Sequence, residues 1–323
     1  MKSSINKTKV LVVGDLMLDE SIFGTASRLT PEGPVPVILK SKTETTLGGA
    51  GFVARVLSDL NIDVTLVGII GEDSISRKVL DCCNKDKINS SLIINHKSYK
   101  TTNKKRIYAS GHLVARLDDE EKFIMSNEIR EKCYKSIVNL FKGKDFKVCI
   151  ISDYDKGFCD DSFIKSLIKL CNKYNVITLV DPKTSDVEKF HSADLIKPND
   201  NEAAKILGLS RENLPSPDFV AKDISKQLNI QNILLTRGAQ GMILYSDKKI
   251  TNINAVQQDV FNVVGAGDTV LAGLSAGLIN GLSIKESSFI ANDLAAEMIS
   301  KLSRTTKPSN SIKERLSSPF DFD

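Results

Sequence analysis

The segment from Asp259 to Ala276, DVFNVVGAGDTVLAGLSA, combines residue types that could transfer a phosphoryl group. Gly265 and Gly267 can adopt backbone angles closed to other residues, so the N–H groups of this loop, which includes Ala266, could converge on one point. A helix starting at Asp268 would add unpaired N–H groups and the positive end of its dipole. Asp268 could then take the proton of an attacking hydroxyl while the loop holds the phosphate. A simpler interpretation is an aspartate that caps a helix after a glycine turn.

Residues 233–244, ILLTRGAQGMIL, could bind the phosphates of a nucleotide. A strand is predicted to end at Thr236, and Gly238 and Gly241 would allow a tight turn where a hydroxyl and backbone N–H groups meet a phosphate. An ordinary hairpin turn is an equal alternative.

Residues 197–208 place Asn199 and Glu202 three positions apart at a predicted helix start. This spacing puts both side chains on one side of the first turn, where they could organise Mg²⁺ and its waters around nucleotide phosphates. By themselves the two residues favour a different interpretation, a capping box that closes the helix end.

Two features near the N-terminus could hold a sugar. Asp15 and Asp19 follow a predicted strand, and a carboxylate can accept hydrogen bonds from two hydroxyls. Gly48 and Gly49 precede a predicted helix, so the backbone there could approach a polyhydroxylated ligand closely. A glycine cluster alone is weak evidence for a ligand site.

Basic side chains in one irregular segment could bind an anionic substrate, and two further segments each place an acid and a base at a strand end. Lys104 and Arg106 would share a face of a strand. Most exposed lysines and arginines are simply solvated, which is the competing interpretation. The candidates are Lys104, Arg106 and Arg116 in residues 97–120, Asp153 and Lys156 in residues 152–157, and Lys183 in residues 180–183.

Strands and helices are predicted to alternate along the chain, with apolar strand-like runs at residues 9–14 and near residues 64, 146, 176, 193 and 232. This predicts a single α/β domain over residues 1–323, with a mostly parallel sheet between helices. Ligands collect outside the carboxyl ends of such strands. Residues 20–46 and 97–120 break the alternation and predict short antiparallel strands outside the main sheet, forming a small β lid that could also pair two subunits into a homodimer.

The composition argues against several classes of protein. The chain has 41% hydrophobic and 26% charged residues and a net charge of +4, with no basic stripe interleaved with aromatic residues, so no nucleic-acid partner is expected. No apolar run is long enough to cross a membrane, and the N-terminus shows no signal peptide. The six cysteines have no metal-ligand spacing, and we expect reduced thiols in a cytoplasmic protein.

Taken in order, these motifs resemble the ribokinase family, the phosphofructokinase-B type of sugar kinase. The order is Gly-Gly before a helix, then Pro-Asn-x-x-Glu, then Thr-x-Gly-x-x-Gly, then Gly-Ala-Gly-Asp. Residues 14–37, 101–118 and 152–157 are more closely similar to the heptose 7-phosphate kinases, the kinase half of the bacterial ADP-heptose synthesis enzymes. In many relatives a nucleotidylyltransferase domain follows, and the length of this chain leaves no room for one, which leads us to expect a kinase domain alone.

The resemblance implies a ribokinase-like three-layer fold that uses ATP and Mg²⁺. It makes Asp268 the catalytic base and Gly265, Ala266 and Gly267 the anion hole. The remaining implied positions fall into three groups: the ATP and Mg²⁺ segment Asn199, Asp200, Asn201 and Glu202, with Glu202 toward the metal; the nucleotide positions Thr236, Gly238, Gly241 and Asn292; and the sugar positions Asp19, Gly48, Gly49 and Phe52.

This chain departs from the family pattern at three places. Phe52 stands where the family usually has an asparagine whose amide contacts sugar hydroxyls. Asn262 and Val264 replace an Asp and a Thr, and because that Asp commonly helps to hold a monovalent cation behind the anion hole, activation by such a cation loses its usual ligand. His112 and Leu113 stand where heptose kinases often carry paired glutamines.

Three hypotheses follow. The first is an ATP- and Mg²⁺-dependent kinase that phosphorylates the anomeric hydroxyl of D-glycero-β-D-manno-heptose 7-phosphate for lipopolysaccharide or surface-glycan precursors. Lys104, Arg106 and Arg116 are then candidates for the distal phosphate, with Lys156 and Lys183 second. The second hypothesis is a kinase of another sugar or sugar phosphate, because Phe52 alters the pocket. The third is a catalytically weak relative that binds nucleotide or sugar as a regulator.

Overall fold

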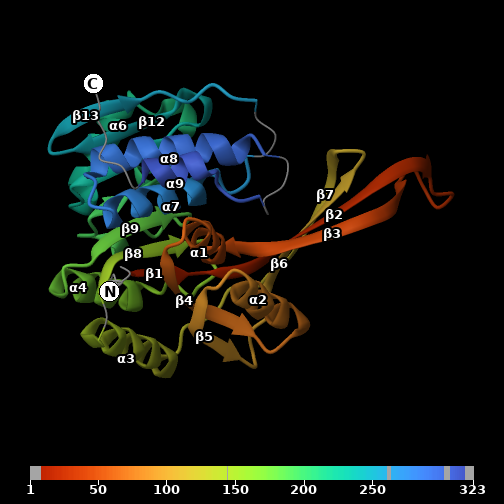
Figure 1. The fold of residues 1–323 in the computed structure, drawn as a ribbon, viewed down its shortest axis with the longest axis horizontal. Helices are drawn as coiled ribbons and strands as arrows, with labels where there is room; N and C mark the ends of the chain where they lie inside the picture. The colour runs from red at the N-terminus through yellow and green to blue at the C-terminus, as the bar shows by residue number, and fades with distance from the viewer. Residues whose placement is uncertain (1–8, 144, 260–262, 302–305, 317–323) are drawn as a thin grey trace, which may run out of the picture.

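The computed structural model describes residues 9–143, 145–259, 263–301 and 306–316 (Figure 1). Its main sheet has nine strands in the order β13-β12-β11-β10-β9-β8-β1-β4-β5. Neighbouring strands from β5 to β11 are parallel, and β12 and β13 add an antiparallel edge, which confirms the predicted mostly parallel sheet. The strands are β1 Lys9–Gly14, β4 Asp63–Gly71, β5 Asn89–His96, β8 Phe146–Asp153, β9 Ile177–Pro182, β10 Leu195–Ile196, β11 Asn232–Thr236, β12 Met242–Ser246 and β13 Lys249–Ile253.

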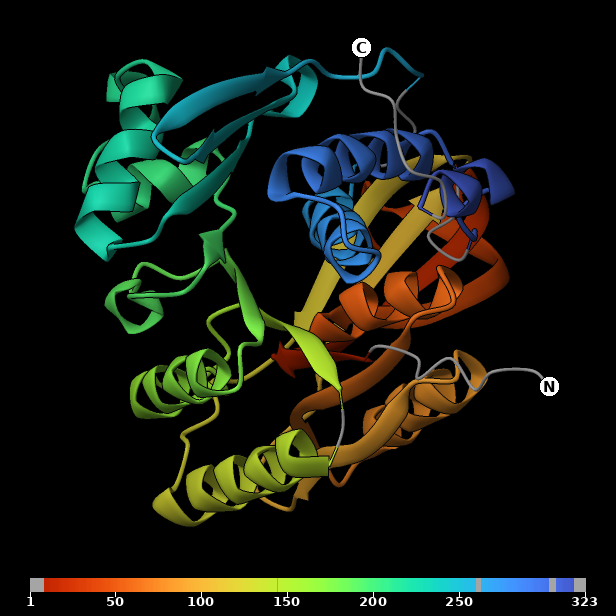
Figure 2. The ribbon, with the colours of Figure 1, turned by 60° about the vertical axis from the view of Figure 1, so that its left-hand side comes forward.

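Helices cover both faces of this sheet, as Figure 2 shows. They are α1 Ala50–Asp59, α2 Ser74–Lys85, α3 Asn127–Gly143, α4 Asp161–Lys173, α5 Asp200–Ile206, α6 Pro217–Leu228, α7 Ala266–Ile279, α8 Ile284–Ile299 and α9 Asn310–Arg315. Three short 3₁₀ turns lie at Glu188–Phe190, Arg211–Asn213 and Gly238–Gln240. Among the described residues, no helix combines the length and the apolar character that crossing a membrane requires.

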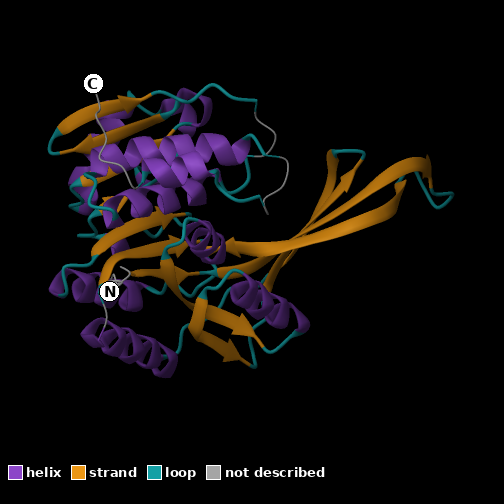
Figure 3. Ribbon diagram, viewed as in Figure 1, coloured by secondary structure: helices purple, strands orange, loops and turns teal. Residues whose placement is uncertain are grey.

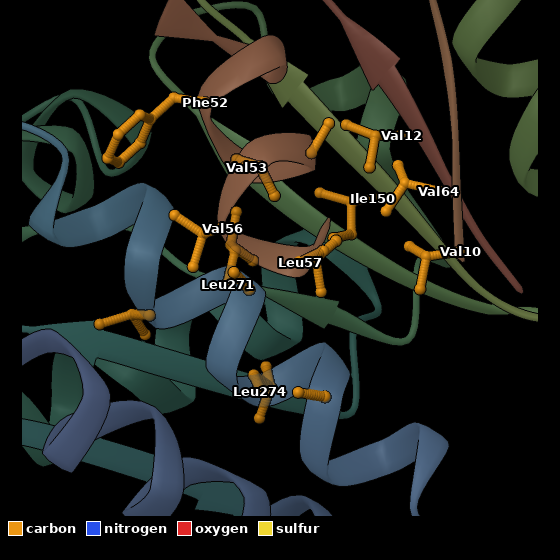
Figure 4. Close-up of a cluster of buried hydrophobic side chains, with 14 of the residues drawn as sticks. Val10, Val12, Phe52, Val53, Val56, Leu57, Val64, Ile150, Leu271 and Leu274 are labelled. Atoms are coloured by element: carbon orange, nitrogen blue, oxygen red, sulfur yellow. The ribbon is translucent and has the colours of Figure 1, made fainter. Parts of the chain in front are cut away.

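The alternation of side chains along β1 explains the three layers. Val10 and Val12 belong to one buried hydrophobic cluster, which includes residues of α1, α7 and α8. Leu11 and Val13 belong to a second cluster on the opposite face, built with residues of α3, α4 and α6. In Figure 4, Val53, Val56 and Leu57 of α1 lie between the strands and α7. A strand buried on both faces must be apolar at every position, which is why KVLVVG reads as a continuous run.

A second sheet of four strands projects from the domain (Figures 1 and 3). We call it the lid sheet: β2 Leu16–Leu29, β3 Pro36–Gly49, β6 Thr102–Ala109 and β7 His112–Asp119, in the order β3-β2-β6-β7. The prediction of a separate sheet here is correct, but two details of it are wrong. The first two strands are long, at 14 residues each, and β2 pairs with β6 in parallel.

The hairpin of β2 and β3 joins the lid sheet to the main domain through very short connections. A single residue, Asp15, separates β1 from β2, and β3 runs into α1 at Gly49. The strands therefore extend beyond the predicted segment 20–46 at both ends, because the polar composition that marked the segment belongs only to its exposed outer half. Its inner half, from Leu16 to Glu20, is buried against the domain.

Candidate active site

A cavity of about 920 Å³ lies where β11, α7 and α8 meet. It brings together segments that are far apart in the sequence, namely the turn after β11, the start of α7 and one side of α8. The glycine motif of residues 238–241 and that of residues 265–267 therefore border the same cavity. The predicted residues that line it are Asn199, Thr236, Gly238, Gly241, Gly265, Ala266, Gly267, Asp268, Asn292 and Lys183.

The turn at Gly238 and Gly241 is the hairpin between two antiparallel strands, β11 and β12. The two interpretations offered by the sequence are thus compatible, because a hairpin turn also borders the cavity. Gly238 has a φ of 55° and Gly241 a φ of 81°, a region of backbone conformation that favours glycine. Asn292 donates its side-chain N–H to the backbone oxygen of Asn254 at 2.9 Å, which ties α8 to the segment just after β13.

Helix α7 begins at Ala266, two residues earlier than the sequence predicts, with Gly265 as its N-cap. Gly265 has a φ of 86°, and its carbonyl oxygen accepts two hydrogen bonds from Thr269, from the backbone N–H at 2.9 Å and the hydroxyl at 2.8 Å. Asp268 lies within the first turn and no side chain caps the helix. The interpretation of Asp268 as a capping residue is therefore wrong, and its buried carboxylate is available for another role.

The carboxylate of Asp268 is held by a tyrosine. The Tyr154 hydroxyl donates toward both carboxylate oxygens, at 2.7 Å to Oδ1 and 3.0 Å to Oδ2. Tyr154 follows the carboxyl end of β8 and lines the cavity. This contact fixes the orientation of the carboxylate toward the cavity before any substrate binds.

Two lysines lie beside the start of α7. A methyl group placed on Gly267 would be 3.1 Å from Lys197 Nζ and 3.9 Å from Lys183 Nζ, so only glycine fits comfortably there. The lysines share Asp181, with Lys183 Nζ 3.0 Å from Oδ2 and Lys197 Nζ 2.9 Å from Oδ1. Burial alone would raise the pKa of Asp181, but the two ammonium groups outweigh it and lower the pKa.

Asn199 and Glu202 form the capping box of α5. The Asn199 side chain accepts the Glu202 N–H at 3.0 Å, and Glu202 Oε2 accepts the Asn199 N–H at 2.8 Å. The other oxygen of Glu202 lies 3.3 Å from Lys183 Nζ. The neighbouring Asp200 faces Arg237 at 3.5 Å, and Asp200 and Asn201 line a smaller pocket beside the main cavity. The simpler interpretation of this pair is therefore correct, and any metal role of Glu202 must coexist with these contacts.

On the inner part of the lid sheet, Asp19 forms an ion pair with Arg106, and both side chains are buried. Gly48 allows this arrangement, because a methyl group there would lie 2.4 Å from Asp19 Oδ2. Gly49 has a φ of 58° and packs against the Asp15 carbonyl. The two glycines thus let β3 pack closely on β2 beside Asp19.

The other basic candidates of the lid sheet have acidic partners. Lys104 Nζ lies 3.5 Å from Glu120 and 3.9 Å from Asp118, and Arg116 lies 3.0 Å from Asp118. Glu120 also pairs with Lys156 at 2.6 Å, which links β7 to the loop after β8. Burial raises the pKa of Glu120, but its bonds to Lys156 and Lys104 outweigh burial and lower it. These contacts join the basic groups into one network, in which Arg116 stays largely exposed.

The comparisons with known proteins agree with this geometry. The sequence profile of the pfkB family carbohydrate kinases matches residues 7–310. The chain belongs to this family. It is 35% identical over 299 residues to a protein from Trichlorobacter lovleyi named "Bifunctional protein HldE", covering 92% of this chain and 60% of the relative. A Campylobacter curvus protein of the same name is 33% identical over 314 residues, covering 97% and 66%. The chain thus spans less than two thirds of the length of these relatives.

Solved structures of pfkB-type kinases share the fold. Phosphofructokinase-2 from Escherichia coli, in complex with substrates and products, superposes with a TM-score of 0.76 at 16% identity, covering 96% of this chain and 98% of that chain. Ribokinase from Arabidopsis thaliana, complexed with ribose and ATP, gives a TM-score of 0.74 at 18% identity, covering 98% and 100%. The expected ribokinase-like fold and the expected family are both confirmed.

The residues at which this chain differs from the usual pfkB-family pattern lie in different parts of the structure. Phe52, expected at a sugar position, is buried in the hydrophobic cluster at the start of α1 (Figure 4), and a methyl group on Gly265 would lie 2.6 Å from its Cε1. Its ring therefore packs against residues 265–267 at the start of α7, which we call the anion loop after the role predicted for it. Val264 precedes this loop and lines a small pocket with Phe52. Asn262 lies outside the described residues, and His112 and Leu113 are exposed at the start of β7.

The loop after β8 is anchored by Asp15, which the sequence suggested as an acceptor for sugar hydroxyls. Its buried carboxylate accepts backbone N–H groups of Tyr154, Lys156 and Phe158 at 2.8, 3.0 and 3.2 Å. Asp153, the candidate acid of this loop, lies 2.6 Å from the buried Lys189. Both carboxylates thus hold the loop that presents Tyr154 and Lys156.

Sequence reasoning missed the roles of Tyr154, Lys197 and Asp181, although each stands in a segment that it quoted. All three lie in or just after the carboxyl ends of parallel strands, β8, β10 and β9. This position is the signal that could have found them, because the carboxyl ends of neighbouring parallel strands meet at one edge of the sheet. Their contacts with Asp268 and Lys183 depend on strand order, which the sequence does not state.

Proposed function

We propose that this chain is an ATP-dependent sugar kinase that phosphorylates the anomeric hydroxyl of D-glycero-β-D-manno-heptose 7-phosphate. The product would serve ADP-heptose synthesis for lipopolysaccharide or surface glycans. The observation that carries the proposal is the buried Asp268 in the first turn of α7, oriented by Tyr154 at the border of a cavity large enough for a nucleotide. The relatives named HldE and the similarity to heptose 7-phosphate kinases support this choice of sugar.

In the proposed reaction Asp268 accepts the proton of the acceptor hydroxyl as its oxygen attacks the terminal phosphorus. The start of α7 supplies backbone N–H groups and a positive dipole end where charge develops on the phosphoryl group. Gly265 and Gly267 keep side chains out of this space. The turn from Thr236 to Gly241 would hold the rest of the nucleotide, with Asn292 bordering the same cavity.

The donor set beside the cavity fits Mg²⁺, which prefers oxygen ligands and retains several waters. Glu202 carries two carboxylate oxygens, each with lone pairs beyond its contacts to Asn199 and Lys183. We propose that Glu202 and Asn199 hold waters of the ion, whose charge would offset that of the nucleotide phosphates. No monovalent cation is part of the proposal, since Asn262 replaces the usual ligand.

For the sugar we propose Asp19, at Gly48 and Gly49, as a partner of hydroxyl groups. Lys104, Arg106, Arg116 and Lys156 are proposed for the distal phosphate. The ion pairs to Asp19, Asp118 and Glu120 would keep these basic groups positioned until a phosphate takes their place. Use of ATP and a sugar phosphate suggests a cytoplasmic location.

A homodimer through the lid sheet is proposed from its apolar outer residues. The rings of Phe23 and Tyr108 stack at 5.1 Å, Leu113 lies opposite Tyr108, and Leu39 lies opposite Thr25 on the same face. Leu39 is 76% exposed and Leu113 is 54% exposed. Adjacent exposed apolar side chains of this kind mark protein interfaces.

The proposal is tested by measuring ADP release with heptose, hexose and pentose phosphates as acceptors. We expect the highest kcat/KM with heptose 7-phosphate and a loss of at least about a hundredfold in kcat for Asp268→Asn. Asp161→Asn, which changes an exposed acid in the first turn of α4, is the matched control and should stay within about twofold. Activity of Asp268→Asn near that of the wild type would show that the proposed base is wrong. A preference for another sugar phosphate would overturn only the substrate.

A further inference from the structure

We infer that Lys183 is a further catalytic residue, which binds the phosphoryl group while it is transferred, and that Asp181 and Lys197 position it for this. The inference rests on the proposed kinase function. It differs from the expectation that Lys183 binds the distal phosphate of the sugar. The reason is its place beside the anion loop, apart from the ion-pair network of the lid sheet.

The position of the ammonium group is the first argument. Lys183 lines the cavity together with Gly265, Gly267 and Asp268. Its Nζ lies 3.9 Å from the place of a methyl group on Gly267 and 5.4 Å from the centre of the Tyr154 ring, whose hydroxyl contacts Asp268. The ammonium group, the anion loop and the proposed base therefore surround one region.

The way the ammonium group is held is the second argument. Asp181 is fully buried and Lys197 is 1% exposed, whereas the Lys183 side chain is 26% exposed toward the cavity. An ammonium group has three donors, and its described carboxylate partners are Asp181 at 3.0 Å and Glu202 at 3.3 Å. A third donor direction thus remains for an oxygen in the cavity.

The charge balance is the third argument. Lys183 and Lys197 both face the carboxylate of Asp181, and Lys183 also faces that of Glu202. Burying Asp181 between two lysines is costly in free energy, and a pair that served stability alone could be replaced by apolar side chains at little cost. At a phosphoryl-transfer site the same arrangement supplies a fixed positive charge.

The transfer forms one bond to phosphorus and breaks another. The acceptor oxygen forms a bond to the terminal phosphorus, and its proton passes to Asp268. The bond from that phosphorus to the bridging oxygen breaks, and its electron pair leaves with ADP. Lys183 exchanges no proton in this step. It donates a hydrogen bond to a non-bridging oxygen of the phosphoryl group, whose negative charge is thereby stabilised.

The test compares Lys183→Met and Lys183→Gln with the wild type. We expect kcat to fall about 10²- to 10³-fold in both, the effect of removing one preorganised donor. Calorimetric titration should show the Kd for ADP with Mg²⁺ changed by less than about threefold. The Kd for ADP with Mg²⁺, aluminium fluoride and the sugar phosphate, a mimic of the transferring group, should rise at least about thirtyfold. Lys78→Met removes a lysine of α2 that pairs with Glu20 of β2, and it should change neither kcat nor the two Kd values.

The outcomes separate this inference from the proposed function. If the wild type transfers phosphate and Lys183→Gln keeps its kcat within about threefold, Lys183 is not catalytic and the kinase proposal stands. If both Kd values rise equally, Lys183 binds the nucleotide without preference for the transferring group, and the inference is wrong. If the wild type neither transfers phosphate nor binds the aluminium fluoride complex more tightly than ADP, both proposals fall.

Discussion

Replacing Gly265 of the anion loop by alanine tests why this position is occupied by glycine. Gly265→Ala would introduce two separate costs. At a φ of 86° a side chain costs about 1–2 kcal/mol in backbone strain. The new methyl group would also lie 2.6 Å from Phe52 Cε1 and 3.1 Å from two further ring atoms, and such overpacking costs about 1–3 kcal/mol. We therefore expect a total loss of about 2–5 kcal/mol in the free energy of unfolding.

Gly281 provides a matched control at the other end of α7. Its φ is 87°, almost the same as that of Gly265, but nothing lies within 4 Å of an added methyl group. Gly281→Ala should therefore lose only the strain of about 1–2 kcal/mol. The difference between the two variants isolates the contact with Phe52.

Urea unfolding of both variants, alone and with Phe52→Leu, would measure these costs. The smaller side chain should relieve the methyl contact, so that Gly265→Ala costs at least about 1 kcal/mol less in the Phe52→Leu background. The kcat of Gly265→Ala should fall as well, since the displaced loop forms the proposed anion hole. If the costs of Gly265→Ala and Phe52→Leu simply add within about 0.5 kcal/mol, the reasoning about their contact is refuted.

Two further predictions concern Asp15 and the lid sheet. Burial and then the nearby Asp153 raise the pKa of Asp15 from an ordinary 3.8 to about 6, against the opposing effect of three backbone N–H groups. Between these two pH values the folded protein holds the proton and the unfolded chain releases it. The free energy of unfolding therefore falls as the pH rises through this window. Relative to Asp15→Asn, the wild type should lose about 2.4 kcal/mol between pH 4 and pH 7, with a slope of at most about 1.4 kcal/mol per pH unit, and a constant difference in urea unfolding would contradict this. Leu113→Asp should convert the proposed dimer to monomers in sedimentation experiments, while Ile124→Asp, at an exposed position outside the lid sheet, should not. A wild-type chain that sediments as a monomer at every concentration would rule out the dimer.

Much of the main domain could be predicted because its strands are buried on both faces. The continuous apolar runs at β1, β4, β8, β9 and β11 follow from that burial, and the helical patterns between them lead to a parallel sheet. The antiparallel pair β12 and β13 was not predicted as such. The edge strand β13, KITNI, carries a mixed pattern of polar and apolar residues, so its composition did not distinguish it from a loop.

The candidate site was predictable where one short segment contains the chemistry, as at Gly265 to Asp268. It was not predictable where function depends on which strand ends are neighbours. Lys183 and Lys197 come from β9 and β10, whose pairing brings both to Asp181. The location of Phe52 likewise depends on the packing of α1 against α7, which motif spacing alone does not reveal.

Asp15 connects the lid sheet to α1 and to the loop that holds Tyr154. It is the single residue between β1 and β2, its carbonyl oxygen accepts the N–H of Ala50 at the start of α1, and its carboxylate holds the loop of Tyr154. Helix α1 in turn carries Phe52 against Gly265. The lid sheet, the start of α1 and the loop of Tyr154 are thus joined at one residue, so a substitution of Asp15 should disturb all three together.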